Sequence, residues 1–251
     1  MIDPAILWLL LFGCALGGFV KGISGSGLPQ IAVPILALAT DAPTAIAIVQ
    51  LPSLAINIFQ TRPRSRSPHR LLPLWPIVTV LFLAAIVGVG LLSVTPPAAL
   101  FLIMAGLTFA SAVFLMHKPD FALRSALQLP VGIPVAAMAG ICAGMSSLAG
   151  PILIPYLMSL RLPKDLFVAT ISLCYLAIII PTIVFIWYWN IVEGALLVQS
   201  TLGIFPALIG MWLGNRLRDR IDERKFRLFV LVMLSVSAVG LLAKALRDLG
   251  S

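Results

Sequence analysis

The spacing of apolar residues along the chain constrains its fold more than any other feature. They fall in blocks of about 18 to 25 residues between short polar connections, and a helix needs about 20 apolar residues to cross a bilayer. Of the 251 residues, 61% are hydrophobic and 10% are charged, whereas about 25% of the residues in a soluble domain are charged. The sequence therefore predicts an all-α polytopic membrane protein with one transmembrane domain over residues 1–251.

An offset of 122 residues reveals an internal repeat. The stretch GFVKGISGSGLP then aligns without a gap with GICAGMSSLAGP, which superimposes Gly18, Gly22, Ser24 and Pro29 on Gly140, Gly144, Ser146 and Pro151. Self-similarity at a fixed offset indicates a duplicated architecture. We therefore predict two repeats, at about residues 4–118 and 126–246.

Each repeat contains five apolar segments, and the second segment is short in both. The segments are predicted at 5–20, 28–39, 44–60, 72–93 and 98–116, and at 128–144, 150–160, 165–188, 194–214 and 226–243. At about 1.5 Å per residue, each short segment reaches about 17 to 18 Å, whereas a bilayer core is about 30 Å thick. We therefore predict half-helices near the repeat starts, with helix breaks at 21–29 and 143–151. The odd number of segments predicts an inverted topology.

Basic residues concentrate in alternate loops, which predicts the orientation of the chain. Loops that the positive-inside rule assigns to the cytoplasm hold 14 of the 17 basic residues, namely Arg62, Arg64, Arg66, Arg70, Lys118, Arg124, Arg161, Lys164, Arg216, Arg218, Arg220, Arg224, Lys225 and Arg227. The connections at 40–43, 94–97 and 189–193 contain no Lys or Arg. This asymmetry predicts a plasma-membrane protein (the inner membrane in a bacterium) with both termini outside.

The remaining composition excludes several other classes of protein. The net charge of +8 is explained by the cytoplasmic loops, so we expect a lipid environment and no nucleic-acid partner. Cys14, Cys142 and Cys174 lie in apolar segments without the spacing of metal ligands. We therefore expect no disulfide framework, metal or other cofactor.

The Gly/Ser/Pro stretches at the two predicted breaks are candidates for an anion site. Glycine lets backbone amides approach a ligand, the N-terminus of a half-helix is electropositive, and serine adds a hydroxyl donor. The candidate residues are Ser24, Gly25, Ser26, Gly27, Pro29 and Gln30 in the first repeat, and Ser146, Ser147, Gly150 and Pro151 in the second. The alternative interpretation is that the Gly-x-x-x-Gly pairs serve only close helix packing.

Lys21 is the one basic residue that lies away from both the loops and the C-terminal end. An ionisable group at membrane depth is costly and commonly functional, so Lys21 is predicted to contribute positive charge to the anion site. The alternative is that its long side chain extends to the membrane interface.

Five further polar residues in apolar segments join the candidate site if their helices turn them inward: Gln50, Asn57, Thr170, Ser172 and Tyr175. For Thr170 and Ser172, the competing interpretation is that each hydroxyl donates to a carbonyl of its own helix.

Inverted repeats with interrupted helices are typical of secondary transporters that work by alternating access. The predicted function is transport of a small anion. A passive anion channel and a lipid-phosphate flippase are the alternatives, because breaks that bind anions would serve them too. An intramembrane enzyme is disfavoured, since the interiors of the apolar segments contain neither a carboxylate nor a histidine for acid–base chemistry.

The stretches GFVKGISGSGLPQIAVPIL and GICAGMSSLAGPILIPYL resemble the sulfite exporter TauE/SafE family, also called the 4-toluene sulfonate uptake permease family. The likeness covers nearly the whole chain, including its duplicated halves and the basic loop at 61–70. The resemblance implies a transporter of sulfite, a sulfonate or a related organosulfur anion, coupled to an ion gradient of H⁺ or Na⁺. It leaves the transport direction and the oligomeric state open.

Overall fold

The computed structural model describes residues 4–61, 74–117, 122–218, 220 and 222–250. All the regular secondary structure within these ranges is helical, and eight helices are long and apolar enough to cross a membrane. Two further apolar helices have ten residues each. The prediction of an all-α polytopic membrane protein is confirmed. Five of the 14 basic residues in the predicted cytoplasmic loops lie outside the described ranges: Arg62, Arg64, Arg66, Arg70 and Lys118.

The helices in chain order are α1 (Pro4–Ser24), α2 (Leu28–Ala37), α3 (Ala42–Gln60), α4 (Trp75–Val94), α5 (Pro97–His117), α6 (Ser125–Ser146), α7 (Gly150–Ser159), α8 (Lys164–Tyr188), α9 (Gly194–Gln199), the 3₁₀ turn η2 (Ser200–Gly203), α10 (Ile204–Leu217) and α11 (Glu223–Gly250). The short helices α2 and α7 begin at Leu28 and Gly150, the residues at which the sequence predicts half-helices.

The segment predicted at 194–214 forms one candidate span, Gly194–Leu217, within which the 3₁₀ turn η2 separates α9 from α10. Pro206 has no backbone N–H, and the α-helical hydrogen bond from residue 206 to residue 202 is therefore missing. Gly203 also packs tightly at this point, because a Cβ there would lie 2.8 Å from Cγ of Pro52 and 2.9 Å from Sγ of Cys14. The 3₁₀ turn accommodates both features.

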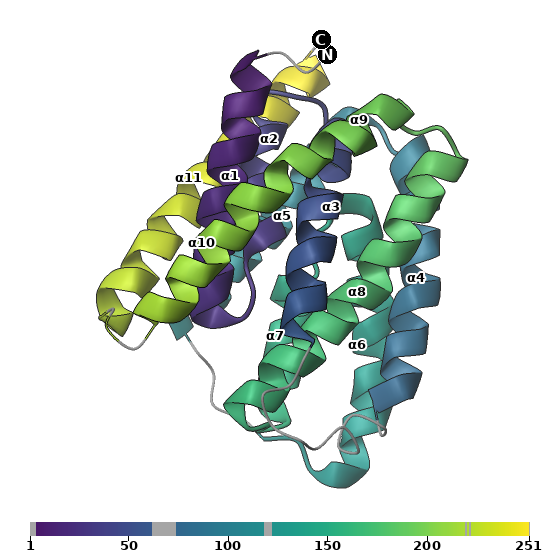
Figure 1. Cartoon of the computed structure of the whole chain (residues 1–251). Coiled ribbons are helices and arrows are strands. Elements are labelled where there is room, and N and C mark those ends of the chain that lie inside the picture. The colour runs from purple at the N-terminus through teal and green to yellow at the C-terminus, as the bar shows by residue number, and fades with distance from the viewer. Residues whose placement is uncertain (1–3, 62–73, 118–121, 219, 221, 251) are drawn as a thin grey trace.

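Helices α3 and α8 form the centre of the molecule. Their most apolar windows are 61% and 67% buried, more than those of the other candidate spans. Around them, α1 packs along α10, α4 packs along α6, and α5 packs along α11 (Figure 1). The N- and C-termini lie together at one end of the molecule (Figure 1).

The Gly-x-x-x-Gly pairs mediate two of these helix contacts. A Cβ at Gly18 or Gly22 of α1 would collide with the main chain of α10, at the carbonyl oxygens of Ala207 and Met211. A Cβ at Gly140 or Gly144 of α6 would collide in the same way with α4. The glycine pairs therefore have the packing role that the alternative interpretation gave them, and the breaks are formed by the residues that follow.

Both breaks have backbone conformations that end a right-handed helix. After α1, Gly25 has φ of 83° and Gly27 has φ of 138°; after α6, Ser147 has φ of 60°. Glycine adopts such angles without strain, whereas serine does so at a cost. Pro29 and Pro151 then lie in the first turns of α2 and α7, where a missing N–H removes no helical hydrogen bond. The chain therefore stops and restarts a helix within three residues at each break.

Candidate functional site

The two breaks contact elements of the other half of the chain. Gln30, in the first turn of α2, places its amide so close to Gly150 that a Cβ at Gly150 would collide with it. The hydroxyl groups of Ser26 and Tyr175 are 2.6 Å apart. Gln50 Nε2 donates a hydrogen bond of 2.7 Å to Ser147 Oγ. The starts of the two half-helices are thus brought together.

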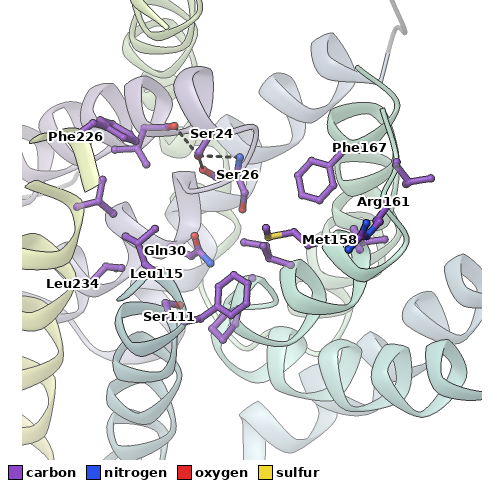
Figure 2. Close-up of a pocket in the computed structure, with 18 residues that line it drawn as sticks. Ser24, Ser26, Gln30, Ser111, Leu115, Met158, Arg161, Phe167, Phe226 and Leu234 are labelled. Carbon is purple, nitrogen blue, oxygen red and sulfur yellow. Dashed lines mark hydrogen bonds between the residues drawn. The ribbon is translucent and has the colours of Figure 1, made fainter. Parts of the chain in front are cut away.

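A cavity of about 520 Å³ lies beside these contacts, between α1, α2, α5, α7, α8 and α11. Five residues predicted from the breaks line it: Ser24, Ser26, Gln30, Gly150 and Pro151. Apolar side chains form most of the remaining wall, and none of the described lining residues is acidic. Figure 2 shows Phe226 and Leu234 on one side of the cavity and Phe167 and Arg161 on the other.

The polar groups of the first break differ in how many partners they have. Ser24 Oγ is engaged with its own break, since it accepts from Ser26 N–H and lies 2.9 Å from the carbonyl oxygen of Val20 as a donor. The half-buried Gln30 amide faces the cavity (Figure 2), and within the described part of the chain it has no hydrogen-bond partner. Gln30 is therefore available to a ligand.

Lys21 is fully buried in the last turn of α1 and does not extend to an interface. Its ammonium donates to the carbonyl oxygen of Gly25 at 3.3 Å and to Oδ1 of Asn57 at 3.0 Å. It also lies 5.0 Å from the centre of the Tyr175 ring. Lys21 is not among the residues that line the cavity. Its charge lies behind the wall formed by Ser26.

The other predicted polar residues lie between α3 and α8 or at the second break. Asn57 Nδ2 donates to the carbonyl oxygen of Ser53, which leaves Oδ1 for Lys21. Ser172 Oγ donates to Gln60 Oε1 at 3.2 Å, whereas the buried Thr170 hydroxyl has no partner among the described residues. Neither Thr170 nor Ser172 donates to its own helix, so that interpretation is wrong for both.

A model of the sulfite exporter TauE/SafE family matches residues 9–241, a range that contains both breaks and every candidate residue. The chain belongs to the sulfite exporter TauE/SafE family. Searches of curated proteins and of solved structures give no significant match. Family membership, together with the eight long apolar helices, identifies a multi-pass integral membrane protein of a transporter family, with a small anion as substrate and lipid as its environment.

In this TauE/SafE member, the starts of both half-helices are electropositive. The first amides of a helix have no intrahelical acceptor, and the helix dipole places about half a positive charge at that end. The N-terminal residues Gly150 and Pro151 of α7 line the cavity, as does Gln30 in the first turn of α2. Ser146 stabilises the second break, because its hydroxyl donates to Cys142 O and accepts from Leu148 N–H.

The sequence did not indicate the far wall of the cavity in this TauE/SafE protein. Ser111, Phe114 and Leu115 come from α5 and Phe226 comes from α11, and both helices have the composition of ordinary apolar spans. Arg161 also lines the cavity, two residues beyond the end of α7. Its φ of 48° is uncommon for a residue other than glycine, but a backbone angle leaves no signal in the sequence.

Proposed function

We propose that the protein moves a small anion, either sulfite, a sulfonate or a related organosulfur anion, across the plasma membrane by alternating access. The observation that carries the proposal is the convergence of two half-helix starts on one cavity, where Gln30 of α2 lies against Gly150 of α7. Half-helix N-termini that point at a shared site are the usual way in which transporters bind anionic groups.

The chemistry of the cavity supports an anion over a cation. The described lining residues include no carboxylate, and Arg161 is the basic residue among them. Ser26 and Gln30 offer a hydroxyl and an amide beside the electropositive helix ends. We propose that these two side chains, with the first amides of α2 and α7, hold the oxyanion, and that Lys21 adds its charge from behind the wall.

Matched helix contacts support the two inverted repeats at 4–118 and 126–246. Gly18 of α1 packs on Ala207 of α10, and Gly140 of α6 packs on Ala85 of α4. Gly140 is related to Gly18, and Ala207 to Ala85, by the offset of 122 that defines the repeat. Such exchanged contacts are expected from a two-fold relation between the halves.

The position of the cavity suggests which side it serves. Leu115 lies in the last turn of α5, Phe226 in the first turn of α11 and Arg161 just past α7, and these helix ends are opposite the two termini (Figure 1). The positive-inside rule places that end in the cytoplasm and both termini outside. The conformation is then open to the cytoplasm, and movement of one half against the other, driven by an H⁺ or Na⁺ gradient, would expose the site outside.

Anion binding can be tested on the purified protein by thermal shift with sulfite, sulfate, thiosulfate, sulfoacetate and taurine, and with acetate as a carboxylate control. A ligand at 100 times its Kd stabilises the folded state by about 2.7 kcal/mol, which raises Tm measurably. We expect at least one sulfur anion to raise Tm and acetate to have no effect. If no anion in the panel raises Tm, the proposed function is wrong.

Transport in proteoliposomes then separates a carrier from the alternative channel. An alternating-access carrier exchanges labelled substrate against unlabelled substrate on the other side, so internal sulfite should accelerate uptake of labelled sulfite. A passive channel gives no such acceleration, and a lipid-phosphate flippase does not transport sulfite. Uptake of labelled sulfite that internal sulfite does not accelerate would indicate a channel instead of a carrier.

The orientation can be tested with a cysteine at Arg124 and another at Thr95, each introduced singly after replacement of Cys14, Cys142 and Cys174 by Ala. Arg124 precedes the start of α6 and Thr95 follows the end of α4, and these two helices pack side by side. We expect a membrane-impermeant maleimide to label Thr95→Cys from outside and Arg124→Cys only after permeabilisation. Labelling of both from one side would contradict the topology.

A further inference from the structure

Four buried polar side chains connect the charge of Lys21 to the wall of the cavity. Lys21, Ser26, Asn57 and Tyr175 are exposed by 0%, 4%, 1% and 6% of their surfaces. They come from α1, the first break, α3 and α8, so both halves of the chain contribute. The Tyr175 ring lies beneath the ammonium, and its hydroxyl is 2.6 Å from that of Ser26, which lines the cavity.

We infer that Tyr175 is a positioning residue that orients the Ser26 hydroxyl to donate to the anion. The inference rests on the proposed anion site and specifies how one of its ligands is held. Among the described residues, the Lys21 ammonium contacts acceptors: the Gly25 carbonyl, the Asn57 amide oxygen and the face of the Tyr175 ring. These contacts hold the ammonium in place without a carboxylate, and Lys21 itself does not line the cavity.

The orientation follows from what each hydroxyl can donate and accept. Each hydroxyl has one proton, so in the Ser26–Tyr175 bond one group donates and the other accepts. A cation near the Tyr175 ring strengthens its O–H as a donor, and the Ser26 oxygen then accepts. The Ser26 hydroxyl can then donate its own proton to another acceptor, and the cavity that Ser26 lines is where an anion could accept it. Donor chains of this kind strengthen along their length, so an anion at Ser26 would benefit from both groups.

A purely structural role for Tyr175 predicts a different result. In that case its hydroxyl would stabilise the packing of α8 on the first break and would contribute nothing to the anion. Tyr156 offers a matched control, since it is equally buried and donates to the Gln128 carbonyl oxygen at 2.9 Å, away from the cavity lining. Tyr156→Phe therefore removes the same hydroxyl from a comparable environment.

The test is a double-mutant cycle on the purified full-length protein. Sulfite and sulfoacetate affinities are measured by titration for the wild type, Ser26→Ala, Tyr175→Phe and the double variant, with Tyr156→Phe as control. We expect Ser26→Ala to weaken binding about tenfold and Tyr175→Phe about fivefold, and the double variant to be no weaker than Ser26→Ala alone. Tyr156→Phe should change affinity less than about twofold. Ser26→Thr, which keeps the hydroxyl, should restore most of the affinity.

The outcomes distinguish failure of the inference from failure of the proposed function. If the wild type binds an anion but Tyr175→Phe binds it equally well, or if the two losses multiply, Tyr175 does not act through Ser26. If the wild type binds neither probe, the anion site itself is wrong. Should Tyr175→Phe fail to insert, the same cycle is measured with Tyr175→Leu in its place, and losses that multiply would again overturn the inference.

Discussion

The two helix breaks are related by the 122-residue offset in the sequence but are stabilised differently. The first break has two glycines at positive φ and a buried ammonium beneath it, that of Lys21. The second break has Ser147 in the left-handed region, held by Gln50, and the residue equivalent to Lys21 is Ala143. A helix break is therefore present at both places, whereas the buried charge of Lys21 is replaced by Ala143 at the second.

This difference indicates that the two breaks contribute differently to the anion site. Both half-helices bring an electropositive start to the cavity, but the first break also has the Lys21 ammonium bound to its own Gly25 carbonyl. An ammonium buried without a carboxylate is costly, and removal of its acceptors or of the ammonium itself should disturb the site strongly. The second break should instead be sensitive to backbone strain and to neutral hydrogen bonds, those of Ser146 and the one between Gln50 and Ser147.

The largest effect is expected from Lys21→Met, which removes the charge that distinguishes the first break. Gly25 O and Asn57 Oδ1 lose their donor, and the anion loses a nearby positive charge. We expect anion affinity to fall about tenfold or more, equivalent to about 1.4 kcal/mol. Titration with the sulfur anion that binds the wild type measures the loss.

Lys21→Arg is the control for geometry, because it keeps the charge but replaces a compact ammonium by a planar fork. We expect it to retain more affinity than Lys21→Met, with a lower Tm because the buried site is fully packed. If Lys21→Met inserts normally and binds every anion as the wild type does, the buried charge has no part in binding and the two breaks are functionally alike.

Gly27→Ala should have the next largest effect, on stability. Its φ of 138° is strained for a residue with a Cβ, and that Cβ would lie 2.8 Å from Cγ1 of Val20. We expect a loss of about 1 to 3 kcal/mol in unfolding free energy. Thermal unfolding in detergent measures it, and the mild variant Gly106→Ala, where a Cβ meets nothing within 4 Å, is the control. Equal Tm values for the two variants would show that the first break tolerates a side chain.

The positions of the breaks could be predicted because helix-breaking residues are local. Pro29 and Pro151 follow a Gly/Ser run in both repeats, and proline and glycine act on the backbone at their own positions. The 3₁₀ turn within the span at 194–214 was not foreseen although Pro206 is a local signal, because the close packing of Gly203 on Pro52 and Cys14 involves residues distant in sequence. A local pattern contains no information on such a contact.

The sequence predicted which residues are candidates for the site, but it did not predict which of their side chains contact one another. Lys21 was recognisable because a lysine in an apolar segment is rare. Its contacts with Asn57 and Tyr175 depend on how α3 and α8 are rotated about their axes, which weakly amphipathic spans do not reveal. The same reason explains why Ser172 bonds to Gln60 instead of to its own helix.

A smaller effect is expected at the far end of the first half-helix. Lys244 of α11 donates to the carbonyl oxygens of Ala37 and Thr40 and lies 4.6 Å from the Phe101 ring centre. The ammonium thus caps the C-terminal end of α2, whereas at the end of α7 the Ser159 carbonyl oxygen accepts from Leu123 N–H. Both half-helices thus have hydrogen bonds at their C-terminal ends. Those at α2 come from a charged side chain, and the one at α7 comes from a backbone amide.

Lys244→Met should therefore loosen α2 more than α7. We expect a loss of about 1 to 2 kcal/mol in stability, with faster hydrogen exchange at residues 36–41 than at 157–161. Arg247→Met, on the exposed side of the same helix, is the matched control and should leave both segments unchanged. Equal protection of 36–41 in both variants would show that the cap does not hold α2.

The smallest effect separates strain from hydrogen bonding at the second break. Ser147→Ala and Ser147→Gly both remove the acceptor of Gln50 Nε2, which costs about 1 kcal/mol. Only glycine also relieves the left-handed conformation at φ of 60°, which is worth about 1 kcal/mol. We therefore expect the Gly variant to be more stable than the Ala variant by about 1 kcal/mol and close to the wild type. Chemical unfolding of the three proteins measures the order. If the Ala and Gly variants are equally destabilised, the backbone at position 147 is not strained, and the contribution of Ser147 to the second break comes from its hydrogen bond with Gln50.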